Sequence, residues 1–135
     1  MVKSTTIYEG GLHCSLVHEP SGAMVATDAP VDNNGKGEAF SPTDLVGAAL
    51  AACMSTIMGI VAARKGIALE GMKVEVAKHM SADPRRIGKL EVVINVPLPA
   101  DHPDRKMLEN AALACPVKQS LHPDIEIPIT WNWLG

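Results

Sequence analysis

Aromatic residues are scarce in this sequence, which has two Trp, one Tyr and one Phe among 135 residues. The hydrophobic fraction is nevertheless 47%, so a core has to be built mainly from aliphatic residues, Ala and Met. Together with a charged fraction of 20%, this composition is typical of a globular chain and excludes a disordered one. The length fits a single domain, which we place over residues 1–135.

Basic clusters and metal-ligand spacings are also missing. The formal net charge is −3, and the only Arg pair, Arg85-Arg86, lies in a segment rich in turn-forming residues. Because nucleic-acid binding requires a basic surface, we expect no nucleic-acid partner. The Cys and His residues show no C-x-x-C or H-x-x-x-H spacing, and there is no phosphate-binding loop or Ser-His-Asp signature. We therefore expect neither a metal nor another cofactor.

Cysteines are few and unevenly placed. Cys14, Cys53 and Cys115 are an odd number at spacings that suggest no disulfide framework. Residues 1–11 lack the apolar core of a signal peptide. These features predict a reducing, cytoplasmic environment in which unpaired thiols persist.

One long uncharged segment is present, over residues 45–63, and it is just long enough to span a bilayer. It is rich in Ala and Gly, however, and contains Ser55 and Thr56. We interpret it as a helix that is buried on nearly all sides of a soluble fold, and we expect no membrane association.

Period-two alternation of apolar residues predicts three short strands in the N-terminal third. We place them at residues 2–8, 12–17 and 23–27. A loop rich in Pro, Asn and Gly follows over residues 28–40. A loop of that length in a small domain is often functional.

The uncharged segment is predicted to form a helix with Ser41 as its N-cap and Pro42 at the first helical position. Asp44 has the spacing of a capping box with Ser41. The helix should run to about residue 65, where Gly66 ends it. Its many Gly and Ala residues leave a thin surface, which suits close packing under a sheet or against a second subunit.

The sequence of the second half predicts a hairpin of two strands at residues 72–78 and 90–96. A helix at residues 101–114, a short helix at 116–121 and a final strand at 125–131 should follow. Pro128 indicates that the final strand lies at a sheet edge. The order βββ-α-ββ-α-β favours the α+β class, with an antiparallel sheet and one long helix.

The three thiols differ in context. Cys14 and Cys53 lie on apolar faces of a strand and of the long helix, where periodicity alone favours a packing role. Cys115 directly precedes Pro116 and can cap the short helix. The helix dipole, together with Lys118 three residues on, would lower the pKa of a thiol in that position, which favours a functional role.

Two motifs together resemble the OsmC/Ohr family, the osmotically inducible protein C-like and organic hydroperoxide resistance-like proteins. The first is Ser41-Pro42-x-Asp44-Leu45, followed by the Ala-rich run that ends at Cys53. The second is Cys-Pro at Cys115, separated from the first by a hairpin and a helix as in that family. The resemblance covers nearly the whole chain.

The resemblance implies an OsmC-like fold, in which an antiparallel sheet wraps around a long buried central helix within an intertwined homodimer. It also implies a thiol-dependent peroxidase that reduces organic hydroperoxides without a cofactor. Cys53 would then be the peroxidatic thiol and Cys115 the resolving thiol, and a dithiol reductant would restore both.

The sequence departs from the Ohr pattern at the groups that activate the thiol. No Arg precedes Arg64, and Thr43 occupies the position of the expected Glu. Lys36, with Glu38 as its orienting partner, is the nearest candidate for the missing cation. Two alternatives stay open: an OsmC-shaped redox-sensing or small-molecule-binding protein without turnover, and a structural dimer whose cysteines are inert.

Overall fold

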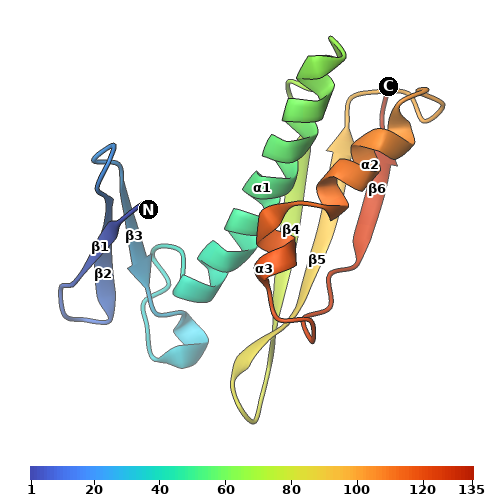
Figure 1. Ribbon diagram of the computed structural model, residues 1–135. Coiled ribbons are helices and arrows are strands. Elements are labelled where there is room, and N and C mark those ends of the chain that lie inside the picture. The colour runs from blue at the N-terminus through green and yellow to red at the C-terminus, as the bar shows by residue number, and fades with distance from the viewer. The chain divides into compact units, whose positions relative to one another are not determined.

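The structure is a computed structural model that describes residues 1–135. The chain divides into two compact units, residues 1–46 and 47–135, which are described separately below. Each unit contains a three-stranded sheet, with strand orders β1-β2-β3 and β4-β5-β6 (Figure 1). The mixed α+β class is as predicted.

The first unit is an antiparallel meander of β1 (Ser4–Tyr8), β2 (His13–His18) and β3 (Met24–Asp28), close to the predicted ranges. Gly10 and Gly11 both have positive φ, 81° and 61°, and so allow the tight turn between β1 and β2. Tyr8 pairs with Cys14, and Cys14 pairs in turn with Thr27. Because paired residues share a face, one face of this sheet carries Tyr8, Cys14, Leu16 and Val25.

The predicted loop follows β3 and contains one short 3-10 turn, η1 (Val31–Asn33). Its ends are fastened at Asp28, whose carboxylate binds His13 Nδ1 at 2.6 Å and accepts the Glu38 backbone N–H at 3.1 Å. The Asp28 N–H donates to the Phe40 carbonyl, which closes the loop on itself. Asp28 is buried, so these bonds are shielded from solvent.

Helix α1 (Pro42–Arg64) begins and ends where the sequence predicts. The Asp44 N–H donates to Ser41 Oγ at 3.0 Å, and the Ser41 N–H donates to Asp44 Oδ2 at 2.9 Å. This is the reciprocal capping box, with Asp in the position that Glu or Gln usually occupies. Gly66, with φ of 68°, follows the last turn.

The second unit places β5 (Arg86–Val96) between β4 (Lys73–Ser81) and β6 (Ile129–Trp133). The β4–β5 hairpin is longer than predicted, since both strands continue toward the turn around Pro84. The β5–β6 pair is parallel, so the expectation of a purely antiparallel sheet is wrong for this pair. Pro128 lies just before β6, at the sheet edge as expected.

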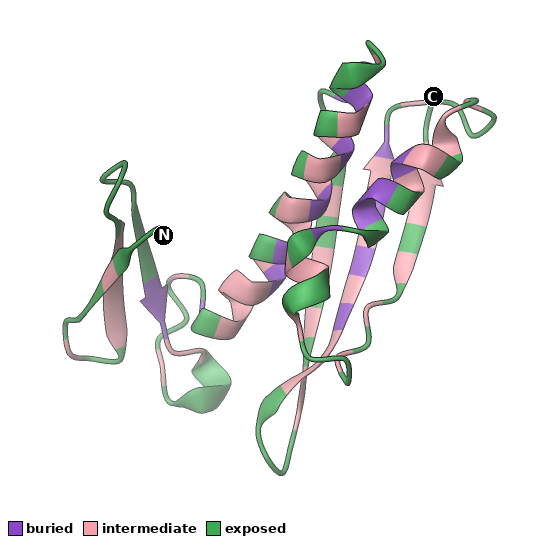
Figure 2. Cartoon of the chain, in the orientation of Figure 1, coloured by how far each residue is buried: buried purple, intermediate pink, exposed green.

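Helices α1, α2 (Arg105–Leu113) and α3 (Pro116–Ser120) lie over one face of this sheet (Figure 1). Alternate residues of β5 point into the resulting core, and α1 contributes residues at a spacing of four (Figure 2). The fully buried apolar positions on these two elements are Leu50, Met54, Met58, Ala62, Leu90, Val92, Ile94 and Val96.

Within one chain, α1 is not buried on nearly all sides as the sequence suggested, since only 28% of its most apolar stretch is buried. Length and composition alone would let α1 cross a membrane, but the core helix of a soluble protein also meets that criterion. Its uncovered face is lined mainly by small residues, and the largest exposed apolar side chain there is Ile60.

Candidate active site

Cys53 lies in the fourth turn of α1 and is partly exposed. Its own helix surrounds it with Ala and Met, and its side chain packs against the core cluster. The thiol is free. Cys53 is therefore a thiol at the border of an apolar core rather than a fully enclosed one.

Cys115 is the N-cap of α3, as predicted, with φ of −62° and ψ of 138°. The Lys118 backbone N–H donates to Cys115 Sγ at 3.3 Å. Pro116 has no N–H and takes the first helical position, which directs the following N–H groups of the turn toward the sulfur. Cys115 is fully buried, in contrast to Cys53.

The electrostatics of Cys115 differ from the sequence prediction. Burial raises the pKa of the Cys115 thiol, and the N–H groups of Lys118 and Val117 only partly offset this. The adjacent Cys53 thiol raises the pKa of Cys115 further. The cap lowers this pKa as predicted, but desolvation outweighs the backbone N–H groups, so the prediction of a net lowering is wrong.

The fold brings Cys53 and Cys115 together although 61 residues separate them along the chain. One thiol is partly accessible, and its neighbour is enclosed. Such a pair can form a disulfide after the accessible thiol has been oxidised.

The burial of Cys115 was missed in the sequence, yet a local signal for it exists. Leu108, Ala111 and Ala112 form the buried face of α2, and Cys115 continues their spacing of three to four residues. The residues that follow it, Pro116 to Ser120, contain no fully buried position.

Lys36 and Glu38, the predicted supporting pair, both lie exposed on the loop of the first unit. No ion pair links the two side chains, and Glu38 contributes only its backbone N–H, to Asp28. The structure therefore gives Lys36 no carboxylate partner. Cys14 is the second residue of β2, in the first unit, and is also free.

A family model described as OsmC-like protein matches residues 35–130 of the chain. A solved structure from Psychrobacter arcticus 273-4 is 45% identical, with a TM-score of 0.93, over 98% of this chain and 96% of that one. That protein is provisionally described as an osmotic stress induced and detoxification response protein.

More distant structures share the fold. An organic hydroperoxide resistance protein OsmC from Legionella pneumophila is 15% identical, with a TM-score of 0.79 over 98% of this chain and 97% of that one. A provisionally named organic hydroperoxide resistance protein from Vibrio cholerae O1, with captopril bound in one of its active sites, is 20% identical. Its TM-score is 0.77 over 99% of this chain and 92% of that one. A comparison with curated proteins found no match.

Proposed function

The chain belongs to the OsmC family, and from this premise we propose that it is a thiol-dependent peroxidase that reduces organic hydroperoxides in the cytoplasm. One observation carries the proposal: a partly exposed thiol, Cys53, lies next to an enclosed thiol, Cys115, that caps a helix. The names of the organic hydroperoxide resistance proteins that share this fold also support organic hydroperoxides as substrates.

In the first step, the Cys53 thiolate attacks the distal oxygen of the hydroperoxide. An S–O bond forms as the O–O bond breaks, and the departing alkoxide takes up a proton and leaves as the alcohol. Cys53 is thereby oxidised to a sulfenic acid. Its place at the surface of the core leaves it accessible to the substrate, which suits it for this step better than Cys115.

In the second step, Cys115 attacks the sulfur of the Cys53 sulfenic acid. An S–S bond forms, the S–OH bond breaks, and hydroxide leaves with a proton as water. The Lys118 N–H stabilises negative charge on Cys115 Sγ as it loses its proton. A dithiol reductant then returns both cysteines to thiols by exchange and becomes a disulfide itself.

The substrate preference follows from the surroundings of the thiols. Cys53 packs against an aliphatic core, and the neighbouring turns of α1 carry small residues. Transfer of an alkyl group from water to such a surface is favourable, because apolar area is buried. Hydrogen peroxide has no alkyl group and therefore lacks this contribution to binding. Organic hydroperoxides are therefore the expected substrates.

The proposed enzyme is a homodimer. The first unit leaves large apolar side chains uncovered on both faces of its sheet, including Ile7, Tyr8 and Met24. Exposed apolar area of this kind marks an association surface, and the small-residue face of α1 permits close approach of a second copy. Light scattering should give twice the mass of one chain; a monomer at micromolar concentration would contradict the proposal.

The supporting groups are proposed to be Lys36 and Glu38, with Lys36 as the activating cation. Replacing Lys36 with Ala should slow the reaction with peroxide, whereas Lys36→Arg should retain it. Lys3→Ala, on an exposed terminal segment, is the matched control. Equal rates for Lys36→Ala and the wild type would leave Lys36 without this role.

The deciding experiment mixes reduced protein with one equivalent of cumene hydroperoxide or hydrogen peroxide. Thiol loss is followed over time and the oxidised cysteines are mapped by mass spectrometry. We expect faster loss with cumene hydroperoxide and a Cys53–Cys115 disulfide. Cys53→Ser should abolish turnover, Cys115→Ser should react once without a disulfide, and Cys14→Ser should behave as the wild type. Full turnover by Cys53→Ser would overturn the proposal.

A second candidate is an OsmC-shaped redox-sensing or small-molecule-binding protein without turnover. The raised pKa of Cys115 and the absence of an Arg before Arg64 favour it, because both weaken thiol activation. Slow thiol loss with both peroxides, no disulfide, and retained binding of an apolar ligand would support this candidate.

A further inference from the structure

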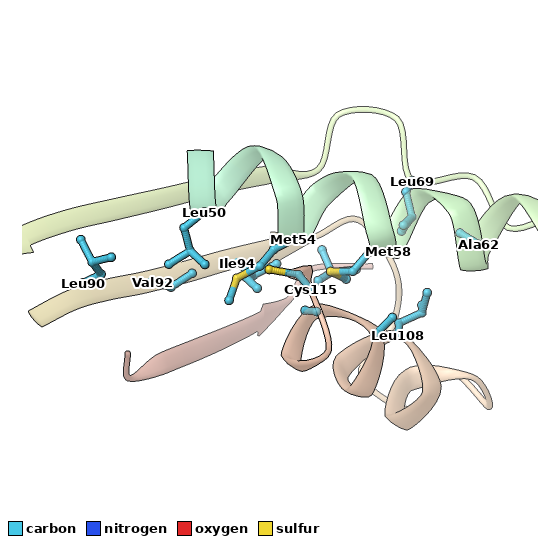
Figure 3. Packing of buried hydrophobic residues seen from close by; sticks show 13 residues of the cluster. Leu50, Met54, Met58, Ala62, Leu69, Leu90, Val92, Ile94, Leu108 and Cys115 are labelled. Atoms are coloured by element: carbon cyan, nitrogen blue, oxygen red, sulfur yellow. The ribbon is translucent and has the colours of Figure 1, made fainter. Parts of the chain in front are cut away.

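Four sulfur-containing side chains belong to the core of the second unit or pack against it. Besides Cys53 and Cys115, the core contains Met54 and Met58, which are both fully buried. Figure 3 shows their thioether groups in the same part of the core as the Cys115 thiol, and all of these residues belong to one packed cluster. No other buried cluster in the chain combines thiols with thioethers.

Helix geometry explains this arrangement. On a helix, positions i, i+1, i+4 and i+5 surround one surface depression that receives a side chain from a neighbouring element. On α1 these positions are Cys53, Met54, Ile57 and Met58. Cys115 is adjacent to Cys53 and fully buried, as expected for a side chain that enters this depression.

The donor set discriminates sharply among metals. Thiolate and thioether sulfur are soft ligands that favour Cu(I). Zinc in proteins is bound by four ligands drawn from Cys, His and carboxylates. No group of three or more His, Cys, Asp or Glu side chains that could hold a metal exists in the chain. Leu50 and Ile94, which belong to the same core cluster, are aliphatic and supply no ligand.

We propose that Cys53, Cys115, Met54 and Met58 form a binding site for one Cu(I) ion. The two thiols lose their protons to solvent, two sulfur–copper bonds form, and the thioethers complete the coordination. Copper enters and stays as Cu(I), so no electron is transferred. The site does not rest on the peroxidase proposal, because binding requires the thiols and not their turnover.

Both thiols must lose their protons to bind the metal, so binding should depend on Cys115 as well as on Cys53. An ion adsorbed on surface His or Met residues would not depend on Cys115.

The test uses the full chain, reduced and without oxygen, titrated with Cu(I) against the coloured Cu(I) chelator bicinchoninate. We expect one equivalent of Cu(I) to pass from the chelator to the protein. The bound Cu(I) should also block the labelling of Cys53 by iodoacetamide. Zn(II) should give neither effect. Absence of Cu(I) transfer, or equally tight binding of Zn(II), would overturn the proposal of a Cu(I) site.

Variants separate the thioethers from the thiols. Met54→Leu combined with Met58→Leu preserves volume and should lower Cu(I) affinity by at least about tenfold, a loss that even outer-shell changes at metal sites can produce. Met72→Leu changes a partly buried Met that is not one of the four proposed ligands. It is the matched control and should bind Cu(I) as the wild type does. Equal affinity of the double variant and the control would overturn the assignment of Met54 and Met58. The thiol variant Cys115→Ser should lose Cu(I) binding, and Cys115→Ala is used in its place if Cys115→Ser does not fold. Circular dichroism checks that all variants are folded.

Discussion

The two units of the chain differ in the kind of side chain that they bury. All of the fully buried apolar side chains belong to residues 47–135, where three helices cover one face of a sheet. In residues 1–46 only Thr27, Asp28 and Ser41 are buried, and all three are polar. Figure 2 shows this contrast, with buried positions on α1, α2 and β5 but none on β1 and β2.

The contrast shows that similar sheets can be held by different forces. The second unit has the aliphatic core that the composition predicted, and burial stabilises it. The first unit is held by its strand ladder, by the bonds at Asp28 and by the capping box. Its exposed apolar faces need a covering surface, which the proposed homodimer would supply.

Two isoleucines test this contrast directly. Ile94 on β5 is fully buried, whereas Ile7 on β1 is 57% exposed. Ile94→Ala should cost about 2–5 kcal/mol, because it removes buried methyl groups and leaves a cavity. Ile7→Ala should cost about 0.5 kcal/mol or less in the monomer, as exposed substitutions usually do. Urea denaturation of both variants measures the difference.

The same pair sharpens the dimer proposal. If a second copy covers the first unit, the cost of Ile7→Ala should grow with protein concentration, since binding stabilises the folded chain by mass action. The cost of Ile94→Ala should stay large throughout. An Ile7→Ala cost that is equally large at every concentration would mean that a single chain already buries this side chain.

Removing Asp28 should be the most damaging polar change in the first unit. Asp28→Ala leaves His13 Nδ1 and the Glu38 N–H without their buried acceptor, which should cost about 1–3 kcal/mol. Val31→Ala, in the same loop and 75% exposed, is the control and should be close to neutral. Hydrogen exchange at the Glu38 amide should accelerate in Asp28→Ala alone; unchanged exchange would mean that the loop does not depend on this carboxylate.

Local signals explain which elements were predictable. Ser41, Pro42 and Asp44 interact within one helical turn, so the start of α1 could be assigned from residue types alone. The pairing of β6 with β5 joins residues far apart in sequence, and alternation in a strand does not specify direction. That is why the parallel pair was missed while the edge position, indicated by Pro128, was found.

The site shows the same division between local and non-local information. The N-cap role of Cys115 follows from the Pro after it, and the structure confirms it. Its raised pKa depends on how deeply α2 and α1 enclose it, which only the packed structure gives. The burial of α1 was overestimated because a helix that is apolar all round has no polar face to show which side stays uncovered within one chain.

The capping box should contribute less than Asp28 but measurably. Ser41→Ala removes the oxygen that accepts the Asp44 N–H, and such changes cost about 0.5–2 kcal/mol. Ser41→Asn should restore most of the loss, since Asn is an equally good N-cap residue. Urea midpoints of the two variants distinguish a lost cap from a lost packing contact; a failure of Ser41→Asn to recover stability would favour packing as the cause.

The smallest effect is a pH dependence that belongs to the second unit alone. Because the pKa of Cys115 is raised on folding, the folded chain holds this proton more tightly than the unfolded chain. The resulting stability is fully present below the ordinary thiol pKa of about 8.5 and is lost as the pH rises through the raised value. The unfolding free energy of the reduced wild type, measured by urea denaturation between about pH 7 and 10, should therefore fall relative to that of Cys115→Ala. A difference between the two chains that stays constant over this range would mean that the N–H groups of Lys118 and Val117 compensate fully for burial.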